Sequence, residues 1–222
     1  MKAEIIVSSD KPVCLVGGAK IENSSFSADF PFVNSFVAVD GGADHLLRSG
    51  ITPAAVIGDL DSISDQARAT FADQLCHISE QETTDFEKAL IRVAAPAVLA
   101  VGFTGGRIDH SLAVLNVMAR YPERAVLLAD PDDVSFIARS DGTDLTLPAG
   151  CRISLMPLAD LSVTATGLEW PLHDMALAPA GKTSASNAAV GGPIHVQTGG
   201  PLLITLPRAH LPEALQAVFR AG

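Results

Sequence analysis

The sequence predicts an α/β fold with a mostly parallel sheet in its N-terminal part, followed by an antiparallel, β-rich part. Up to about residue 132, short apolar runs alternate with amphipathic segments, which is the βα rhythm of a parallel sheet. Beyond that point, short apolar runs follow one another closely and are separated by Gly, Pro and Asp, which indicates an antiparallel sandwich or roll. We therefore expect two domains, residues 1–132 and 133–222.

Each expected strand is a short apolar run that ends at turn-forming or acidic residues. In the first domain the strands are expected at residues 13–16, 36–39, 54–57, 75–78, 97–101 and 125–129. Helical periodicity is clearest over residues 86–94 and 111–120. In the second domain the strands are expected at residues 134–138, 145–147, 153–156, 161–164, 194–197 and 202–206. A short helix is expected over residues 211–219, where Pro212 suits the first turn.

Composition narrows the functional classes. The net charge of −10 disfavours nucleic acid and anionic membranes as partners. The longest apolar segment, around residues 93–101, contains Pro96 and is far shorter than the roughly 20 residues that span a membrane. With no secretion signal evident, a cytoplasmic location is expected. Cys14, Cys76 and Cys151 are widely spaced in apolar runs, so we expect neither a disulfide framework nor a thiolate metal site.

Acidic side chains follow several of the expected strands. Asp59 and Asp61 stand two residues apart at the end of one strand, so their carboxylates could converge on one hard cation. Asp40 and Asp109 follow two other strands. Any one of these acids could simply cap a helix. Because the carboxyl ends of parallel strands share one edge, the set together predicts a Mg-phosphate site.

Two further segments carry groups suited to phosphate. Thr84 and Glu87 form a capping box at the start of a helix, which leaves Asp85 and Lys88 available for a ligand. Residues 104–107 (Thr-Gly-Gly-Arg) combine a close backbone approach with a guanidinium, so they favour an anion.

Other common enzyme motifs are missing. The segment Gly181-Lys182-Thr183 resembles the end of a P-loop, but Ala176 stands where the earlier glycine is required. No dinucleotide-binding glycine pattern follows the first strand, no G-x-S-x-G elbow occurs, and the six histidines lack zinc spacing. The sequence therefore disfavours a Rossmann dehydrogenase, a serine hydrolase and a zinc enzyme.

Trp170 is the one tryptophan, and it lies in a turn. Packing in a core or an interface is the ordinary role of such a residue. An exposed aromatic platform for a flat cation is the functional alternative.

Six segments, in order, resemble those of the thiamine pyrophosphokinase family: residues 40–43, 58–62, 84–88, 105–110, 166–170 and 184–187. The resemblance implies an N-terminal three-layer α/β domain that binds ATP and Mg²⁺, and a C-terminal antiparallel β-sandwich for thiamine binding and dimerisation. The implied reaction transfers the diphosphate of ATP to the hydroxyethyl oxygen of thiamine and releases AMP. The implied assembly is a homodimer whose site is shared between subunits.

The resemblance also implies roles for individual residues. Catalytic roles fall on Asp59, Asp61, Asp85, Lys88 and Arg107, of which the three aspartates are the implied metal ligands. Nucleotide, phosphate or thiamine contacts fall on Asp40, Gln81, Thr84, Asp109, His110, Trp170 and Ser186. The proton acceptor is open between Asp59 and Asp85. Glu169 and Glu82 depart from the family pattern, which usually has lysine and aspartate there.

Two other functions are considered. Asp59-Leu60-Asp61 also matches the acid pair of haloacid-dehalogenase-like phosphatases, although that class carries the pair after its first strand. A sensor that binds ATP or thiamine without catalysis is the non-enzymatic alternative, and it would release no AMP.

Overall fold

The computed structural model describes residues 3–21 and 26–219 and separates into two compact units, Met1–Val117 and Met118–Gly222. This division follows spatial proximity and places strand β8 (Val126–Ala129) in the second unit. The domain boundary expected at residue 132 stays a prediction. Within the described part of the chain, no helix is long and apolar enough to cross a membrane.

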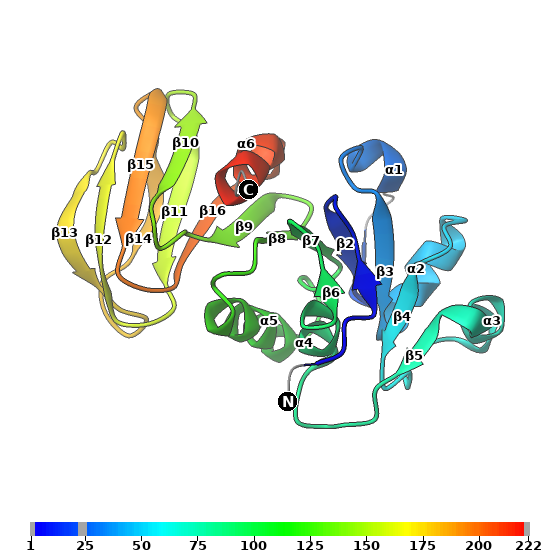
Figure 1. Ribbon diagram of the computed structural model, residues 1–222. Helices are drawn as coiled ribbons and strands as arrows, with labels where there is room; N and C mark the ends of the chain where they lie inside the picture. The colour runs from blue at the N-terminus through cyan, green and yellow to red at the C-terminus, as the bar shows by residue number, and fades with distance from the viewer. Residues whose placement is uncertain (1–2, 22–25, 220–222) are drawn as a thin grey trace. The chain divides into compact units, whose positions relative to one another are not determined.

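The first unit is built on five parallel strands in the order β7-β2-β3-β4-β5 (Figure 1). The strands are β2 (Val13–Val16), β3 (Ser35–Val39), β4 (Ala55–Gly58), β5 (Leu75–His77) and β7 (Val98–Val101). Every residue of β2, β4 and β7 is buried, the pattern of strands that are covered on both faces. The parallel sheet expected from the sequence is confirmed.

Short helices connect these strands and cover the sheet. They are α1 (Phe26–Asp29), η1 (Asp40–Gly42), α2 (Ala43–Arg48), α3 (Asp65–Thr70), η2 (Ala72–Gln74), α4 (Asp85–Leu90) and α5 (Ile108–Arg120). Helix α2 packs on β2 and β3, whereas α4 packs on β3 and β4. Figure 1 shows α2 and α3 on one side of the sheet and α4 on the other, so this unit has three layers.

The helix expected over residues 86–94 is wrong at its C-terminal end. Helix α4 ends at Leu90, and the next residues form strand β6 (Val93–Ala94), which pairs in parallel with β1 (Val7–Ser8). The apolar spacing continues past Leu90, but the distant strand at Val7 supplies the partner, and periodicity cannot reveal that partner. The helix expected over residues 111–120 begins earlier, at Ile108.

The second unit contains two antiparallel sheets. One has the order β14-β11-β16-β9-β8, and the other the order β10-β15-β12-β13. The remaining elements are β9 (Asp133–Ile137), β10 (Thr143–Leu147), β11 (Arg152–Pro157), β12 (Leu161–Thr166), β13 (Leu172–Leu177), β14 (Ser184–Ala188), β15 (Gly192–Thr198), β16 (Leu202–Pro207), η3 (Arg208–His210) and α6 (Leu211–Val218).

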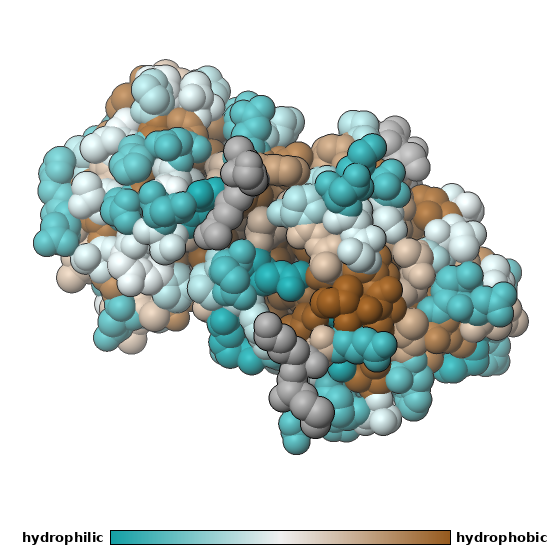
Figure 2. Space-filling model, viewed as in Figure 1, coloured by the Kyte–Doolittle hydropathy of each residue, from teal (hydrophilic) through white to brown (hydrophobic). Residues whose placement is uncertain are grey.

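Alternate residues of β10 and β15 are buried, so each strand turns one face to the core. The outward faces are polar, and the visible side of this unit in Figure 2 is mostly hydrophilic. In the same view, hydrophobic residues gather over the strands of the first unit. The antiparallel sandwich predicted for this part of the chain is confirmed, whereas β13 and β14 were not predicted.

Gly42, the last residue of η1, lies against the end of β2 at a point where no side chain fits. A Cβ atom at this position would lie 1.7 Å from the carbonyl oxygen of Val16. Gly42→Ala is therefore expected to lower the free energy of unfolding by roughly 3 kcal/mol, because backbone must move to relieve the overlap. Denaturant unfolding measures the change. Gly199→Ala is the control, since its Cβ would have no neighbour closer than 3.8 Å, and equal losses in both variants would contradict the prediction.

Candidate active site

Three carboxylates gather at the carboxyl ends of β3 and β4 in the first unit. The two strands pair in parallel with Val39 opposite Ile57, so the residues that follow them emerge side by side. One carboxylate oxygen from each of Asp40, Asp59 and Asp61 lies within 4.8 Å of the others. We call these three residues the acidic cluster. The convergence of Asp59 and Asp61 that the sequence predicts is thus present, with Asp40 as the third member.

The backbone around the acidic cluster has an unusual shape. Asp40 has φ 46° and Leu60, between the other two acids, has φ 63°, a left-handed conformation that costs of order 1 kcal/mol or more outside glycine. Gly58 leaves room for this arrangement, since a Cβ there would lie 3.1 Å from the Cβ of Asp40. Strained residues of this kind collect at functional sites, where the surrounding structure holds them.

Asp40 is the buried member of the acidic cluster. Its side chain is 8% exposed, and its Oδ1 accepts no hydrogen bond from the described residues. Burial raises the pKa of Asp40, and the negative charges of Asp85 and Asp61 raise it further, whereas hydrogen bonding from Ser62 opposes the rise. A buried carboxylate oxygen without a donor is a ready ligand for a cation.

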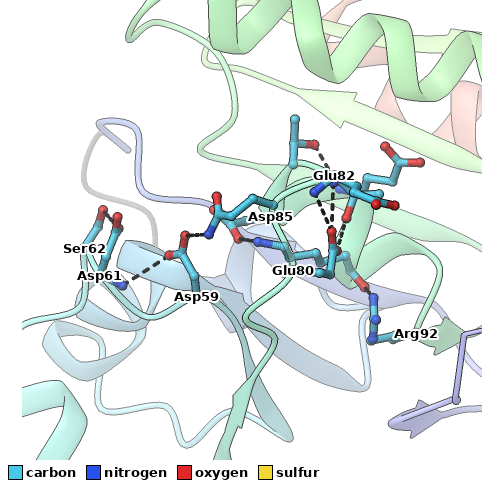
Figure 3. A network of polar contacts seen from close by, with 12 residues as sticks. Asp59, Asp61, Ser62, Glu80, Glu82, Asp85 and Arg92 are labelled. Atoms are coloured by element: carbon cyan, nitrogen blue, oxygen red, sulfur yellow. Dashed lines mark hydrogen bonds and ion pairs between the residues drawn. The ribbon is translucent and has the colours of Figure 1, made fainter.

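Asp59 has the opposite electrostatic setting. The amide of Gln81 donates to its Oδ2 at 3.2 Å, and the backbone N–H of Asp61 donates to its Oδ1 at 3.3 Å (Figure 3). The Gln81 hydrogen bond is the largest cause that lowers the pKa of Asp59, and the charge of Lys88 adds to it. Asp59 is therefore ionised at neutral pH, as a metal ligand must be.

The loop before α4 holds Gln81 in reach of Asp59. The carboxylate of Glu80 accepts hydrogen bonds from the backbone N–H groups of Glu82 and Thr83, at 2.8 and 3.0 Å, and from the hydroxyl of Thr83 (Figure 3). These bonds lower the pKa of Glu80. Glu80 was given no role from the sequence.

Helix α4 presents Asp85 and Lys88. The hydroxyl of Thr84 caps the helix by accepting from the N–H of Glu87 at 3.3 Å, which confirms that half of the expected capping box. The ammonium of Lys88 pairs with Asp85 at 3.0 Å, and the Lys88 side chain is only 2% exposed. Asp85 is not a member of the acidic cluster, although its charge acts on Asp40.

Arg107, Asp109 and His110 are exposed around the start of α5. Arg107 and Asp109 form an ion pair at 2.5 Å. This pair lowers the pKa of Asp109 and raises the pKa of Arg107. Gly105 has φ 78°, so the turn before the helix needs the conformational freedom of glycine.

Trp170 and Ser186 lie in the second unit, where Asn187 connects their segments. Asn187 is buried and donates to the carbonyl of Trp170 at 2.8 Å, while its Oδ1 accepts from the N–H of Trp170 at 3.2 Å. The Trp170 ring itself is 57% exposed, so it is not a core residue of this unit. Ser186 has φ 61° and its N–H donates to Ser154 Oγ. Asn187 was given no role from the sequence, although a buried polar residue in a strand is such a signal.

In the first unit, therefore, the structure brings together six sequence-predicted residues and leaves a seventh as a helix cap beside them. Contacts or electrostatic interactions connect Asp40, Asp59, Asp61, Gln81, Asp85 and Lys88. Thr84 caps the helix of the last two. Among the described residues, Arg107 and Asp109 bond to each other and not to this group.

Comparison with known families matches both units. Residues 33–128 match the family model of the thiamin pyrophosphokinase catalytic domain, and residues 139–203 match that of the thiamin pyrophosphokinase vitamin B1 binding domain. Thiamine pyrophosphokinase 2 of rice (Oryza sativa subsp. japonica) is 27% identical over 209 residues, covering 79% of this chain and 78% of its own. Thiamine pyrophosphokinase of Bacillus subtilis is 28% identical over 151 residues, covering 63% of this chain and 71% of its own.

Solved structures share the fold. Thiamin pyrophosphokinase from Candida albicans has a TM-score of 0.76 at 17% identity and covers 90% of this chain and 92% of its own. Thiamine pyrophosphokinase from Bacillus subtilis has a TM-score of 0.73 at 22% identity, with 89% and 98% covered. Together the two family models match well over half of the sequence, so the chain is that of a two-domain kinase. It belongs to the thiamine pyrophosphokinase family.

Asp40→Asn is expected to stabilise the metal-free protein at neutral pH. Because the folded pKa of Asp40 lies above its unfolded value, the folded state binds more protons between the two, and stability falls as pH rises through that window. Asparagine does not ionise, so the variant does not lose stability in this way as pH rises. With EDTA present, we expect the variant to melt roughly 2–4 °C above wild type at pH 7, the shift that about 1 kcal/mol produces in a chain of this size.

This difference should vanish as pH falls towards the ordinary range of a carboxyl pKa, because Asp40 is then neutral as well. Thermal unfolding between pH 4 and 8 measures it. A variant that is less stable than wild type at pH 7, or a gain that persists at pH 4, would contradict the electrostatic description of Asp40.

Proposed function

We propose that the protein transfers the diphosphate group of ATP to the hydroxyethyl oxygen of thiamine, which yields thiamine diphosphate and AMP. Membership of the thiamine pyrophosphokinase family supports this reaction. The structural observation that carries the proposal is the acidic cluster at the edge of the parallel sheet, inside the segment that matches the catalytic-domain model. Ligands of open α/β sheets bind at this edge.

The residues of the acidic cluster fit a magnesium ion. They offer carboxylate oxygens, the ligands that Mg²⁺ prefers, and Asp40 supplies a buried oxygen that has no other described partner. We propose that Asp40, Asp59 and Asp61 would hold Mg²⁺; Asp85, a ligand that the resemblance implied, lies outside the acidic cluster and would act through its charge. When bound, the ion would neutralise charge on the phosphate oxygens of ATP.

The side chains around the cluster would position the reacting groups. Gln81 keeps Asp59 in place, and the Asp85–Lys88 pair puts a positive group beside the acids. We propose that Lys88 turns from Asp85 to a phosphate oxygen when ATP binds. Asp59 or Asp85 would accept a hydrogen bond from the thiamine hydroxyl, and the lowered pKa of Asp59 favours orientation of that hydroxyl over removal of its proton.

Arg107, Asp109, His110 and Thr84 are proposed contacts to the nucleotide. The guanidinium of Arg107 is exposed, so it can exchange its ion pair with Asp109 for an ion pair with a phosphate. Two helix starts, at Thr84 and before α5, would add backbone N–H groups.

Trp170 and Ser186 are proposed contacts to thiamine, whose thiazolium ring carries a positive charge that an aromatic face attracts. Exposure of the Trp170 ring supports this role. We also propose a homodimer in which one subunit covers thiamine that is held mainly by the other. A cytoplasmic location and a functional boundary near residue 132 are parts of the same proposal. The gap between the two family matches, residues 129–138, supports the boundary.

Nucleotide product analysis tests the reaction. Asp59→Asn and Asp61→Asn should each lower the rate of AMP formation from ATP and thiamine by roughly a hundredfold or more, because each removes a charged proposed ligand of the Mg²⁺ ion that would neutralise the phosphates. Asp73→Asn, an exposed acid in η2, is the control and should retain near-normal turnover. Binding of ATP without AMP release would indicate a sensor, and release of inorganic phosphate through a phosphoenzyme would indicate a phosphatase; either result rejects the proposal.

Trp170→Ala should raise the Michaelis constant for thiamine about tenfold, since a desolvated cation–π contact contributes up to about 2 kcal/mol. The Michaelis constant for ATP should stay within twofold of the wild-type value. Steady-state kinetics with each substrate varied in turn give both values. Val190→Ala is the matched control, because Val190 and Trp170 are both 57% exposed in the second unit; an unchanged constant for thiamine in Trp170→Ala would remove the tryptophan from the thiamine site.

A further inference from the structure

Asp44 in the first turn of α2 makes a two-point contact with Ser64. The backbone N–H of Ser64 donates to Asp44 Oδ2 at 3.1 Å, and the Ser64 hydroxyl donates to Asp44 Oδ1. Ser64 is also the N-cap of α3, where its Oγ accepts from the N–H of Ala67 at 3.1 Å. The Asp44–Ser64 contact therefore joins the start of α2 to the start of α3.

These two helix starts follow the segments that carry the acidic cluster. Asp40 opens η1, which runs directly into α2. Asp59 and Asp61 lie in the turn that leads to Ser64 and α3. One segment begins at the end of β3 and the other at the end of β4, so the sheet fixes the first end of each. The Asp44–Ser64 contact fixes their second ends relative to each other, and it therefore holds the two segments that carry the three carboxylates.

The turn that carries Asp59 and Asp61 needs such support. Leu60 is held in a left-handed conformation, its side chain is 4% exposed, and its carbonyl accepts a hydrogen bond from the guanidinium of Arg68. Arg68 lies in α3. Helix α3 thus holds the turn through Arg68, and Asp44 holds α3 through Ser64.

We infer that Asp44 is a positioning residue for the divalent cation: by fixing Ser64, it sets the distance between Asp40 and the pair Asp59 and Asp61. This inference rests on the metal role in the proposed function. Asp44 lies outside the acidic cluster, and each of its oxygens accepts a hydrogen bond from Ser64.

Binding of Mn²⁺ to the substrate-free protein tests the inference, with the free ion measured by electron paramagnetic resonance. Asp44→Ala should raise the dissociation constant about tenfold or more, the usual effect of losing a group that orients metal ligands. Asp65→Ala, an exposed acid next to Ser64, removes the same charge at the start of α3 and should change the constant less than about twofold. Asp44→Asn keeps an oxygen for Ser64 and should restore most of the affinity.

Hydrogen exchange of residues 59–64 in the metal-free protein gives a second readout. Asp44→Ala should speed exchange there at least fivefold, and Asp65→Ala should not. An Asp44→Ala protein with wild-type Mn²⁺ affinity, or with wild-type exchange in this segment, overturns the inference. If Asp44→Ala does not fold, Ser64→Ala replaces it: this variant loses the hydroxyl bond but keeps the amide bond, and an unchanged affinity overturns the inference equally.

Failure of the metal role itself gives a different result. In that case Asp59→Asn would bind Mn²⁺ as well as wild type does, and the proposed function would lose its metal site. Loss of binding in Asp59→Asn together with unchanged binding in Asp44→Ala would leave the metal site intact and reject only the role of Asp44.

Discussion

The parallel pairing of β3 with β4 is the constraint on which the site depends. Because Val39 lies opposite Ile57, the segments that follow the two strands leave the sheet next to each other. Three carboxylates meet there, and each has an oxygen within 4.8 Å of the others. Like charges at this separation repel, and one of them is buried. Such an arrangement is unfavourable for a protein that only has to fold, and the proposed divalent cation would offset the repulsion.

Unequal surroundings give the acids different properties. Burial raises the pKa of Asp40, whereas a hydrogen bond from Gln81 lowers the pKa of Asp59. Gln81 in turn belongs to a loop that Glu80 organises, and Lys88 contributes a buried positive charge from α4. The site is therefore preorganised by neighbours from several strand ends and not by the acids alone.

Much of the parallel sheet and of the acidic cluster could be predicted from the sequence, because the apolar runs are long enough to identify strands and the acids follow them directly. The sequence put Asp40 in the set of acids at the strand ends, but the family resemblance implied Asp85 and not Asp40 as the third metal ligand, and the left-handed conformation of Asp40 in a single 3₁₀ turn leaves no periodic signal. The sequence also missed β14, whose residues Ser184–Ala188 are small and polar and pair through a shifted register with β11. The end of α4 was predicted too late because β6 depends on pairing with the distant Val7.

The support of the site was equally hidden. Asp44 and Asn187 act through hydrogen bonds to backbone groups of distant segments, and such bonds depend on folding that no local pattern encodes, whereas Glu80 bonds to backbone groups of its own loop. Side chains that touch a ligand leave motifs, whereas side chains that hold those residues in place leave few.

Anomalous diffraction from a crystal grown with Mn²⁺ and a non-hydrolysable ATP analogue tests the central claim most directly. The account predicts one manganese peak about 2.1–2.3 Å from a carboxylate oxygen of each of Asp40, Asp59 and Asp61, with phosphate oxygens completing its coordination. A well-ordered nucleotide whose metal ion contacts none of these three side chains would contradict it.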